Sequence, residues 1–491
     1  MAVSRSPTTF VSTCFLVLLF YFVPAMVFQM QMVLPTKTTT NKEIPAIAPE
    51  MSVESMLNDA VNSATGKLFL GQPIRTFSGE RVFRDYQPPK QHSPTKPMTS
   101  LAKKCDRWNV VTTIFAPSEA VLRAASVSGW CTVIVADTKT PKNYMQDAGF
   151  SSSSLKNHTI QYLSVEDQQA WYQRAKDTAV GVFLKATPFR HFSRKNVGYL
   201  YAIQHGARFI FDFDDDNLLP LDGSYTQQRV LPPLTNTTHL QGARIVQSEH
   251  IAFNHHPLMG APIENSWPRG FPLPYVQEKF SHGTIVETDV TISMGSVSVL
   301  QFCADGNPDV DAVHRLVHPL PMLFEPYNHA AKVSTDTIII STQGALVVPT
   351  NSFAPYNAQA TLHTYPVMWA LLLPLSVPGR VSDIWRAYFA QAIYKDLGLS
   401  VVMLPPKVQQ ERNEHNYLAD MQAELDLYFK GEKLLEFLRD WSSNENSIPG
   451  RIEALWIELY ERGYIEVKDI LVVKAWLAAL AEIGYEFPTI A

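Results

Sequence analysis

One short segment, Phe209 to Asn217, restricts the fold of this chain more than any other part of the sequence. It begins with the apolar run Phe-Ile-Phe-Asp-Phe, in which every second residue is aromatic, and three further aspartates follow directly. Such a run is typical of a buried β-strand, and side chains alternate along a strand, so Asp212 shares a face with Asp214, and Asp214 with Asp216. The segment therefore predicts a core strand that ends in a group of carboxylates.

The residues alone allow two interpretations of these carboxylates, a metal site or a solvated loop. Carboxylate oxygens are hard ligands that suit Mg²⁺ or Mn²⁺, and an Asp-x-Asp spacing presents two of them on one strand face. Most acidic triplets, however, are solvated loop residues. The apolar residues before them favour the metal site, because α/β proteins bind ligands at the carboxyl ends of core strands.

Length and charge limit the class of protein. With 491 residues, 46% of them hydrophobic, the chain has enough apolar material for one large domain with additions. A net charge of −5, a pI near 6.3 and the lack of a basic run give no electrostatic reason to expect nucleic acid as a partner. A small anion that is held by a metal is a more suitable partner for a chain with this charge.

The N-terminal region predicts a membrane anchor. An uncharged stretch from Phe10 to Phe28, with apolar character up to Leu34, is long enough to cross a bilayer as a helix. A cleaved signal peptide is the alternative, but the stretch exceeds the usual hydrophobic region and no small-x-small cleavage site follows it. We therefore expect a cytosolic tail over residues 1–9, an uncleaved anchor over 10–34 and the bulk of the protein in the secretory lumen.

Two sequons are compatible with a lumenal location, and the cysteines permit one disulfide. Asn157 and Asn236 each begin an Asn-x-Thr sequon. Beyond the anchor, which contains Cys14, three cysteines remain, an odd number that permits one disulfide and one free thiol. Cys105 and Cys131 are the pair to test, because each lies beside one of two predicted neighbouring strands. A zinc site is not expected, since no Cys-x-x-Cys spacing occurs.

The order of predicted elements after the anchor indicates an α/β domain. Residues 35–104 are rich in Pro, Thr, Ser and Lys and predict a flexible stem. A β-rich run over 108–115, a helical segment over 118–127 and a strand over 131–136 then follow, in the order that opens a nucleotide-binding unit. Asp137 ends the second strand, where it can accept hydrogen bonds from a base or a ribose, or serve as a turn residue.

Arg194, Lys195 and Asn196 lie just before a predicted helix over 197–205, which leads to the acidic strand. Such groups at a helix N-terminus can bind a diphosphate, or they can form a solvated loop. The motif Gly-x-Gly-x-x-Gly is absent from the opening unit, which argues against an ordinary dinucleotide oxidoreductase.

The second half of the chain predicts two more strands, over 337–341 and 345–348, and a helix that starts near Asp383. From the residues alone, the stronger reading of Asp383 is that it caps this helix. After residue 406 the apolar residues recur at helical spacing, as in a packed core. We therefore expect an α/β domain over 105–406 and a helical region over 407–491.

Several runs together resemble one known family. They are Arg194–Ala207, Phe211–Asp215, Trp267–Gly270, Asn307–Ala312, Ala354–Gln359, Ser382–Tyr388, Ala475–Leu477 and Gly484–Tyr485. Over about residues 105 to 491 the chain is thereby similar to the STELLO proteins of plants. That family is described as Golgi-located, type II membrane and glycosyltransferase-like, with distant similarity to reversibly glycosylated polypeptides and UDP-arabinopyranose mutases.

The resemblance implies a GT-A-like fold in which an Asp-x-Asp motif holds Mn²⁺ or Mg²⁺ against the diphosphate of a nucleotide sugar, most often a UDP-sugar. It assigns the metal to Asp214 and Asp216. Asp212 and Asp215 are implied in support of this pair. Together with the residues whose positions in the predicted elements suggest a donor contact, the expected donor-side residues are Asp137, Arg194, Lys195, Asn196, Asp212 and Asp215. Asp383 matches an acid on the acceptor side in the mutase-like relatives, and Arg269 lies where they carry an arginine that contacts the sugar or becomes glycosylated, so both are expected at the catalytic centre.

The expected function is metal-dependent transfer of a sugar from a nucleotide sugar to a glycan or protein acceptor in the Golgi, for instance in cell-wall polysaccharide synthesis. The expected partners are that donor and acceptor, the membrane, and a second copy of the chain or a polysaccharide synthase. Two alternatives stay open: a non-catalytic assembly factor for such synthases, and a mutase or self-glycosylating protein. Four clustered aspartates favour an active site over a scaffold, which has little need to hold that much negative charge together.

Overall fold

The computed structural model describes residues 68–69, 72–73, 75–87, 105–149, 159–219, 238–278, 281–324, 331–333, 338–341, 344–412 and 416–490. All of them lie in the larger of two compact units of the chain, residues 56–491. The predicted tail and anchor, and both sequon residues, Asn157 and Asn236, lie outside the described residues. Within the described ranges no helix is long and apolar enough to cross a membrane.

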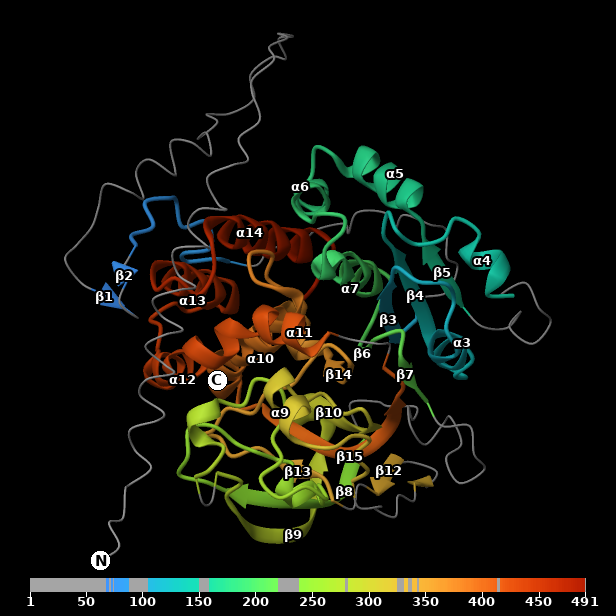
Figure 1. The fold of residues 1–491 in the computed structure, drawn as a ribbon. Helices are drawn as coiled ribbons and strands as arrows, with labels where there is room; N and C mark the ends of the chain where they lie inside the picture. The colour runs from blue at the N-terminus through green and yellow to red at the C-terminus, as the bar shows by residue number, and fades with distance from the viewer. Residues whose placement is uncertain are drawn as a thin grey trace, which may run out of the picture. The chain divides into compact units, whose positions relative to one another are not determined.

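Thirteen of the described strands form one mixed β-sheet, around which the described part of the chain is organised (Figure 1). In spatial order its main path runs β11 (Ala331–Val333), β12 (Ile338–Ser341), β8 (His239–Gln247), β13 (Leu346–Val347), β15 (Ser400–Gln410), β10 (Val297–Gly306), β14 (Ala360–Thr364), β6 (Phe209–Phe213), β3 (Arg107–Thr113), β4 (Cys131–Ala136) and β5 (Ile160–Leu163). Beside this path β7 (Asn217–Leu218) pairs with β15, and β9 (Thr284–Ser293) pairs with β8. The predicted α/β class is confirmed.

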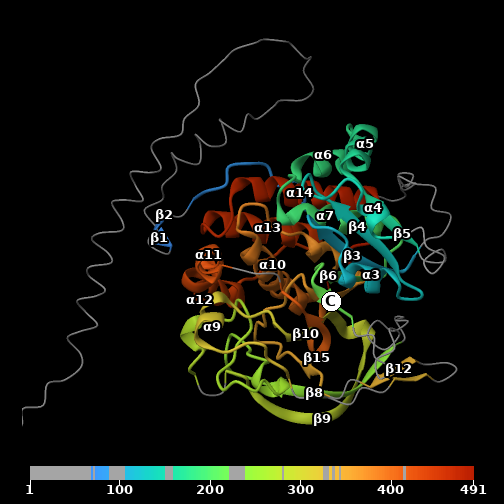
Figure 2. The same ribbon diagram turned by 45° about the vertical axis from the view of Figure 1, so that its right-hand side comes forward.

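Helices lie on both sides of this sheet (Figure 2). They are α3 (Glu119–Ala125), α4 (Tyr144–Asp147), α5 (Val165–Ala175), α6 (Ala179–Ala186), α7 (Lys195–Gln204), α9 (Ala312–Val317), α10 (Gly379–Tyr394), α11 (Tyr417–Ala423), α12 (Leu425–Asp440), α13 (Ile448–Glu461) and α14 (Val467–Glu482). Shorter 3-10 turns span Phe192–Arg194, Pro257–Met259, Leu273–Tyr275, Met294–Ser296, Tyr365–Leu371 and Lys395–Leu397.

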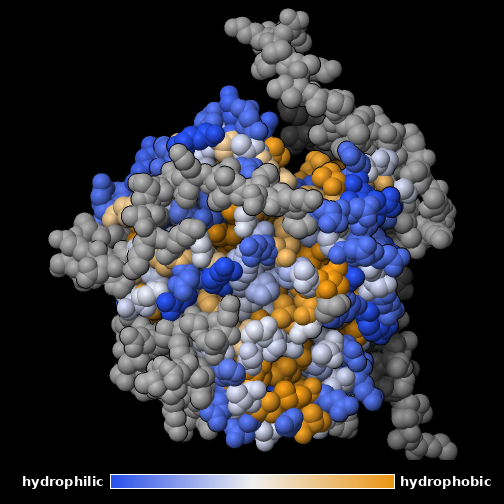
Figure 3. Space-filling model, turned by 180° about the vertical axis from the view of Figure 1, so that it is seen from behind, coloured by the Kyte–Doolittle hydropathy of each residue, from blue (hydrophilic) through white to orange (hydrophobic). Residues whose placement is uncertain are grey.

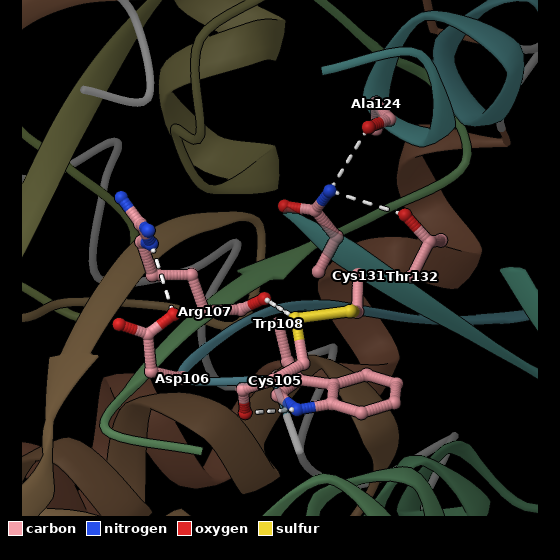
Figure 4. The surroundings of a disulfide bond; sticks show 8 residues. Cys105, Asp106, Arg107, Trp108, Ala124, Cys131 and Thr132 are labelled. Atoms are coloured by element: carbon pink, nitrogen blue, oxygen red, sulfur yellow. Dashed lines mark hydrogen bonds and ion pairs between the residues drawn. A yellow bond between two sulfur atoms is a disulfide. The ribbon is translucent and has the colours of Figure 1, made fainter. Parts of the chain in front are cut away.

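The first strands form the predicted opening unit. β3 and β4 are parallel, and α3 connects them, beginning after Ser118, whose hydroxyl accepts a hydrogen bond from the Val121 amide at 3.3 Å. Cys105 and Cys131 form a disulfide at the start of this pair, with their Cα atoms 6.3 Å apart (Figure 4), so the predicted pairing is confirmed. The remaining cysteine in the described residues, Cys303, is free and buried.

β3 and β4 are buried on both faces. Val110 of β3 and Val133 of β4 belong to one hydrophobic cluster, whereas Val111 of β3 and Ile134 of β4 belong to another. The larger cluster includes side chains of α7, α10, α13 and α14, and the smaller includes side chains of α3. Helix α7 approaches the sheet at Gly198, where an added Cβ would lie 2.7 Å from Val135 and 2.8 Å from Val110. The face seen from behind mixes hydrophobic and hydrophilic residues (Figure 3).

The predicted acidic strand is confirmed as β6, in which all five residues are buried. It runs parallel to β3 and antiparallel to β14. Because β3, β4 and β6 point the same way, their carboxyl ends meet at one edge of the sheet. Residues 214–216 therefore lie next to the end of the opening unit.

The predicted boundary at residue 406 falls inside a strand. β15 continues through Pro405 and Pro406 to Gln410, and its pairing with β10 shifts register between Leu404 and Val408. Prolines lack the amide that a ladder needs, so a bulge is where a strand tolerates them. The helical region starts at Tyr417 with α11.

Part of the predicted flexible stem is docked on the C-terminal helices. In the segment over residues 75–87, Phe83 is buried, and the amides of Val82 and Phe83 donate to the two carboxylate oxygens of Glu453 at 2.8 and 2.7 Å. Glu453 belongs to α13 and is itself fully buried. The prediction of a flexible stem is therefore wrong for this segment, because a charged acceptor inside the helical layer binds its backbone.

We expect Glu453→Gln to lower the free energy of unfolding by about 2–3 kcal/mol, because an amide NH₂ would face one of the two N–H donors that the carboxylate accepts, of which the Phe83 amide is buried. Urea unfolding followed by circular dichroism measures the loss. Glu445→Gln is the matched control: Glu445 binds the side chain of Arg81 at 2.8 Å in a partly exposed pair, with Arg81 30% and Glu445 12% exposed, so the expected loss is smaller, about 1 kcal/mol. Equal losses for both variants would contradict the role given to Glu453.

Candidate functional site

A pocket of about 620 Å³ opens at the carboxyl ends of β3, β4 and β6. Its lining includes Thr113, Phe115, Asp137, Arg190, His191, Phe192, Asp214, Asp215, Asp216, Arg269, Asp309, Gln359, Arg380, Asp383, Gln410 and Arg412. The volume lies within the range of small-molecule sites. Six residues predicted for the site share this pocket: Asp137, Asp214, Asp215, Asp216, Arg269 and Asp383. The four others, Asp212, Arg194, Lys195 and Asn196, are absent from its lining.

Asp212 lies in the core rather than at the strand end. One carboxylate oxygen lies 2.6 Å from Nζ of Lys195, and the other accepts from the Tyr199 hydroxyl at 2.7 Å and from Arg386 at 3.1 Å. Asp212, Lys195 and Tyr199 are all wholly buried. Burial opposes the charge of Lys195, but Asp212 and Asp214 outweigh it and raise the pKa of the ammonium group. Asp212 thus anchors α7 and α10 to β6.

Asp214 connects this buried network to the pocket. Its Oδ1 accepts from Lys195 at 3.0 Å, so Asp212 and Asp214 do share a face, and its side chain is 31% exposed. Burial raises the pKa of Asp214 to about 7, against the lowering effect of Lys195. A carboxylate held in this way can exchange its proton for a cation near neutral pH.

The other two acids point in different directions. Asp215 accepts a hydrogen bond from the Thr113 hydroxyl at the end of β3, and burial raises the pKa of its carboxyl group. Asp216 accepts from the Gln410 side-chain amide at 3.2 Å. The Asn217 side chain accepts from the Asp214 amide at 3.1 Å and closes the turn that carries all three acids.

The fit of these acids to a divalent cation depends on a further ligand. Across the described ranges, no three His, Cys, Asp or Glu side chains gather closely enough to hold a metal. Asp214 and Asp216 nevertheless supply two carboxylates to one pocket, and Mg²⁺-type ions are commonly held by one or two carboxylates together with substrate phosphates and water. The donor set therefore fits a cation that is shared with a bound ligand.

Asp137 serves a structural purpose at the pocket wall. Its two oxygens accept from the Arg190 amide at 3.0 and 2.7 Å, and its Oδ1 also accepts from the amide and hydroxyl of Thr138. These bonds hold Arg190 at a left-handed φ of 57°. The reading of Asp137 as a turn residue has this support, and its contact with a ribose stays a prediction.

The side chains of Arg194 and Asn196 form hydrogen bonds in the protein interior and not with the pocket. Arg194 donates to the Gln168 side chain at 2.7 Å and to the Thr187 carbonyl at 2.6 Å, while Asn196 exchanges two hydrogen bonds with the Leu373 backbone. The reason is that α7 begins at Lys195, two residues before the predicted start, so these residues face the core. The same segment reaches the pocket through 190–192 instead.

Arg269 is held by two acids from distant parts of the chain. Its Nε and Nη2 donate to Asp309 at 2.8 and 2.9 Å, and its Nη1 and Nη2 donate to Asp383 at 2.9 and 2.8 Å. Nη1 also donates to the Arg380 carbonyl, so all five N–H groups of the guanidinium have acceptors. Burial disfavours the charge, but the two acids outweigh it and raise the pKa of Arg269.

Asp309 was not among the predicted site residues, although it lies in the Asn307–Ala312 run. Asn357 also donates to it, at 2.7 Å. Burial raises the pKa of this carboxyl group, but Arg269 and Asn357 outweigh it and lower the pKa to about 2. Its contact with Arg269 and its place in the pocket lining identify Asp309 as a member of the site, and both depend on the folded structure.

The prediction that Asp383 caps a helix is wrong. α10 begins at Gly379 after Pro378, which places Asp383 inside the helix. Each oxygen of Asp383 accepts two hydrogen bonds, from Arg269 and from the amide of either Ile384 or Ala358. The carboxylate is therefore fully used in holding Arg269 and the loop before β14.

Comparisons with known proteins agree with the resemblance predicted from the sequence. Residues 380–491 match the family model described as STELLO glycosyltransferases. The chain is 30% identical over 409 residues to "Probable glycosyltransferase STELLO2" and 28% identical over 397 residues to "Probable glycosyltransferase STELLO1", both from Arabidopsis thaliana. These matches cover 80% and 78% of this chain but 47% and 45% of the relatives, so the chain spans about half their length.

Among solved structures, a mannosyltransferase, PcManGT from Pyrobaculum calidifontis in complex with GDP-Man and Mn²⁺, aligns with 81% of this chain and 77% of its own. The TM-score is 0.27 and the sequence identity is 10%. A likeness this low supports no inference about this chain.

Proposed function

Because this chain is similar over most of its length to STELLO glycosyltransferases, we propose that it transfers a sugar from a nucleotide-sugar donor to an acceptor. The observation that carries the proposal is the pocket at the carboxyl ends of β3, β4 and β6, where Asp214 and Asp216 stand beside the β3–α3–β4 unit. This is the edge at which α/β sheets bind nucleotides. The proposal includes a GT-A-like arrangement of that half of the sheet.

In this proposal Mn²⁺ or Mg²⁺ is bound by Asp214 and Asp216. When present, such a cation stabilises the charge that develops on the departing diphosphate. Lys195 orients Asp214 by donating a hydrogen bond to its carboxylate, and the Thr113 hydroxyl does the same for Asp215. Phe115 supplies an apolar surface for a nucleoside, since its side chain is exposed in the pocket lining.

The cellular setting belongs to the same proposal: a single-pass type II protein of the Golgi membrane, its pocket in the lumen, acting on a glycan or protein in cell-wall synthesis. An assembly factor for polysaccharide synthases is the alternative from another class. A built pocket with two carboxylates from one strand end favours the enzyme. Self-glycosylation at Arg269 is disfavoured, because every N–H of its guanidinium already has an acceptor.

A panel of UDP- and GDP-sugars, titrated into the full-length protein with Mn²⁺ by calorimetry, tests the proposal. We expect one donor to bind, and Asp214→Asn with Asp216→Asn to weaken Mn²⁺-dependent binding by at least about 100-fold, since even residues that only support metal ligands are worth 10–100-fold.

Glu287→Gln with Asp289→Asn is the matched control, because these acids have the same spacing and are exposed on β9. Unchanged donor binding in the Asp214 and Asp216 variant would overturn the metal assignment. A wild-type protein that binds no donor would favour the assembly factor.

A further inference from the structure

One oxygen beside Asp216 has no hydrogen-bond partner. Gln410, at the end of β15, is 4% exposed and lines the pocket. Its Nε2 donates to Asp216 at 3.2 Å, whereas its Oε1 is buried and meets no donor. Buried polar atoms in native proteins nearly always have partners, so a partner is expected for this oxygen as well.

The position of Gln410 is fixed by the backbone around it. β15 pairs antiparallel with β7, and this pairing places Gln410 opposite Asn217, directly after the acidic turn. The Glu411 amide donates to the Asp216 carbonyl at 3.3 Å, and the Asn307 amide donates to the Gln410 carbonyl at 3.3 Å. β15 therefore holds the side chain against the acids from a second strand.

The orientation of the amide follows from charge. If the amide were turned over, its oxygen would face the Asp216 carboxylate, and two acceptors would be in contact without a proton between them. With Nε2 toward Asp216, Oε1 is left as a buried acceptor on a residue that lines the pocket. An acceptor there cannot bind a diphosphate directly, because phosphate oxygens are acceptors too.

The chemistry of the neighbouring acids identifies the missing group. Asp214 and Asp216 provide two carboxylates, and the described residues contain no third acid, His or Cys close enough to complete a cation site. Amide oxygens belong to the same hard ligand class as carboxylates and suit Mg²⁺, Mn²⁺ and Ca²⁺. A cation at the acids would thus satisfy the oxygen that the fold leaves without a donor.

We propose that Oε1 of Gln410 is a ligand of the divalent cation that binds Asp214 and Asp216. This inference rests on the proposed function, because it concerns the same metal, and it adds a ligand from outside the Asp-x-Asp motif. It makes β15, as well as β6, part of the cation site.

The test is Mn²⁺ binding to the full-length protein without any nucleotide, followed by calorimetry and by the electron paramagnetic resonance signal of free Mn²⁺. Gln410→Leu should weaken Mn²⁺ binding by about 10–100-fold. Gln409→Leu is the matched control, because it makes the same change at the preceding, exposed position of β15 and should leave the affinity unchanged.

Gln410→Glu gives a second readout that does not depend on the leucine variant. Without a cation, the new carboxylate would repel Asp216, so Mn²⁺ should raise the Tm of this variant more than it raises the Tm of the wild type. Wild-type affinity in Gln410→Leu, or an equal Tm shift in Gln410→Glu, would overturn the role of Gln410 and leave the proposed function standing. No Mn²⁺ binding by the wild-type protein would overturn the metal site as a whole.

Discussion

Replacing Asp212 with asparagine is expected to lower the free energy of unfolding by about 3–5 kcal/mol, because it removes a charge from a fully buried ionic network. Asp212 contacts Lys195 at 2.6 Å and Arg386 at 3.1 Å. The side chains of Asp212 and Lys195 are fully buried, and that of Arg386 is 1% exposed. Asparagine has nearly the same volume, so the loss reports the two cations left without their shared carboxylate. Chemical unfolding followed by circular dichroism measures it.

Two further variants separate the charge from other causes. Asp106→Asn is the surface control: Asp106 pairs with Arg107 at 3.2 Å, its side chain is 52% exposed, and the expected loss is below about 1 kcal/mol. Lys195→Met in the Asp212→Asn background removes one of the two cations that have lost this carboxylate and should recover part of the stability. If the double variant were as unstable as the sum of the two single variants, the ionic account of Asp212 would fail.

The same aspartate shows how far the sequence pattern reaches. The alternation over 209–217 correctly predicts a buried strand with acids at its end, and it correctly places Asp212 and Asp214 on one face. It carries no information on the partners: Arg386 is 174 residues away in the chain and reaches Asp212 only because α10 packs on this face of the sheet. A residue assigned to donor binding is therefore a core ion-pair residue.

The predicted starts of α7 and α10 are wrong for the same physical reason. α7 begins at Lys195 without a side-chain cap, and α10 begins after Pro378, also without one, so neither start carries the Ser, Thr, Asp or Asn cap that a sequence pattern relies on. Where a cap is present, as at Ser118, the prediction is confirmed. The docking of residues 75–87 escaped prediction because it depends on the buried carboxylate of Glu453, more than 360 residues further along the chain.

Asp383→Asn is expected to lower kcat for the proposed sugar transfer by about 100-fold, because it displaces Arg269 from its position in the pocket. Arg269 is held in one plane by Asp309 on one side and by Asp383 on the other. An amide in place of Asp383 turns one N–H donor against the guanidinium. A shift of about 1 Å in such a group is enough for a loss of this size. Steady-state kinetics with the donor found by the binding panel measures kcat and KM separately.

Asp309→Asn is the matched variant, since Asp309 binds the same guanidinium through two hydrogen bonds and also lines the pocket. If Asp383 acts through Arg269, the two asparagine variants should lose kcat to a similar extent, and the double variant should lose little more than either one. The alternative is that Asp383 itself takes a proton from the acceptor. Asp383→Asn would then lose far more activity than Asp309→Asn, and the acidic limb of its pH profile for kcat/KM would vanish while that of Asp309→Asn stayed. The four hydrogen bonds that Asp383 already accepts favour the first outcome, because a base must free an oxygen to act.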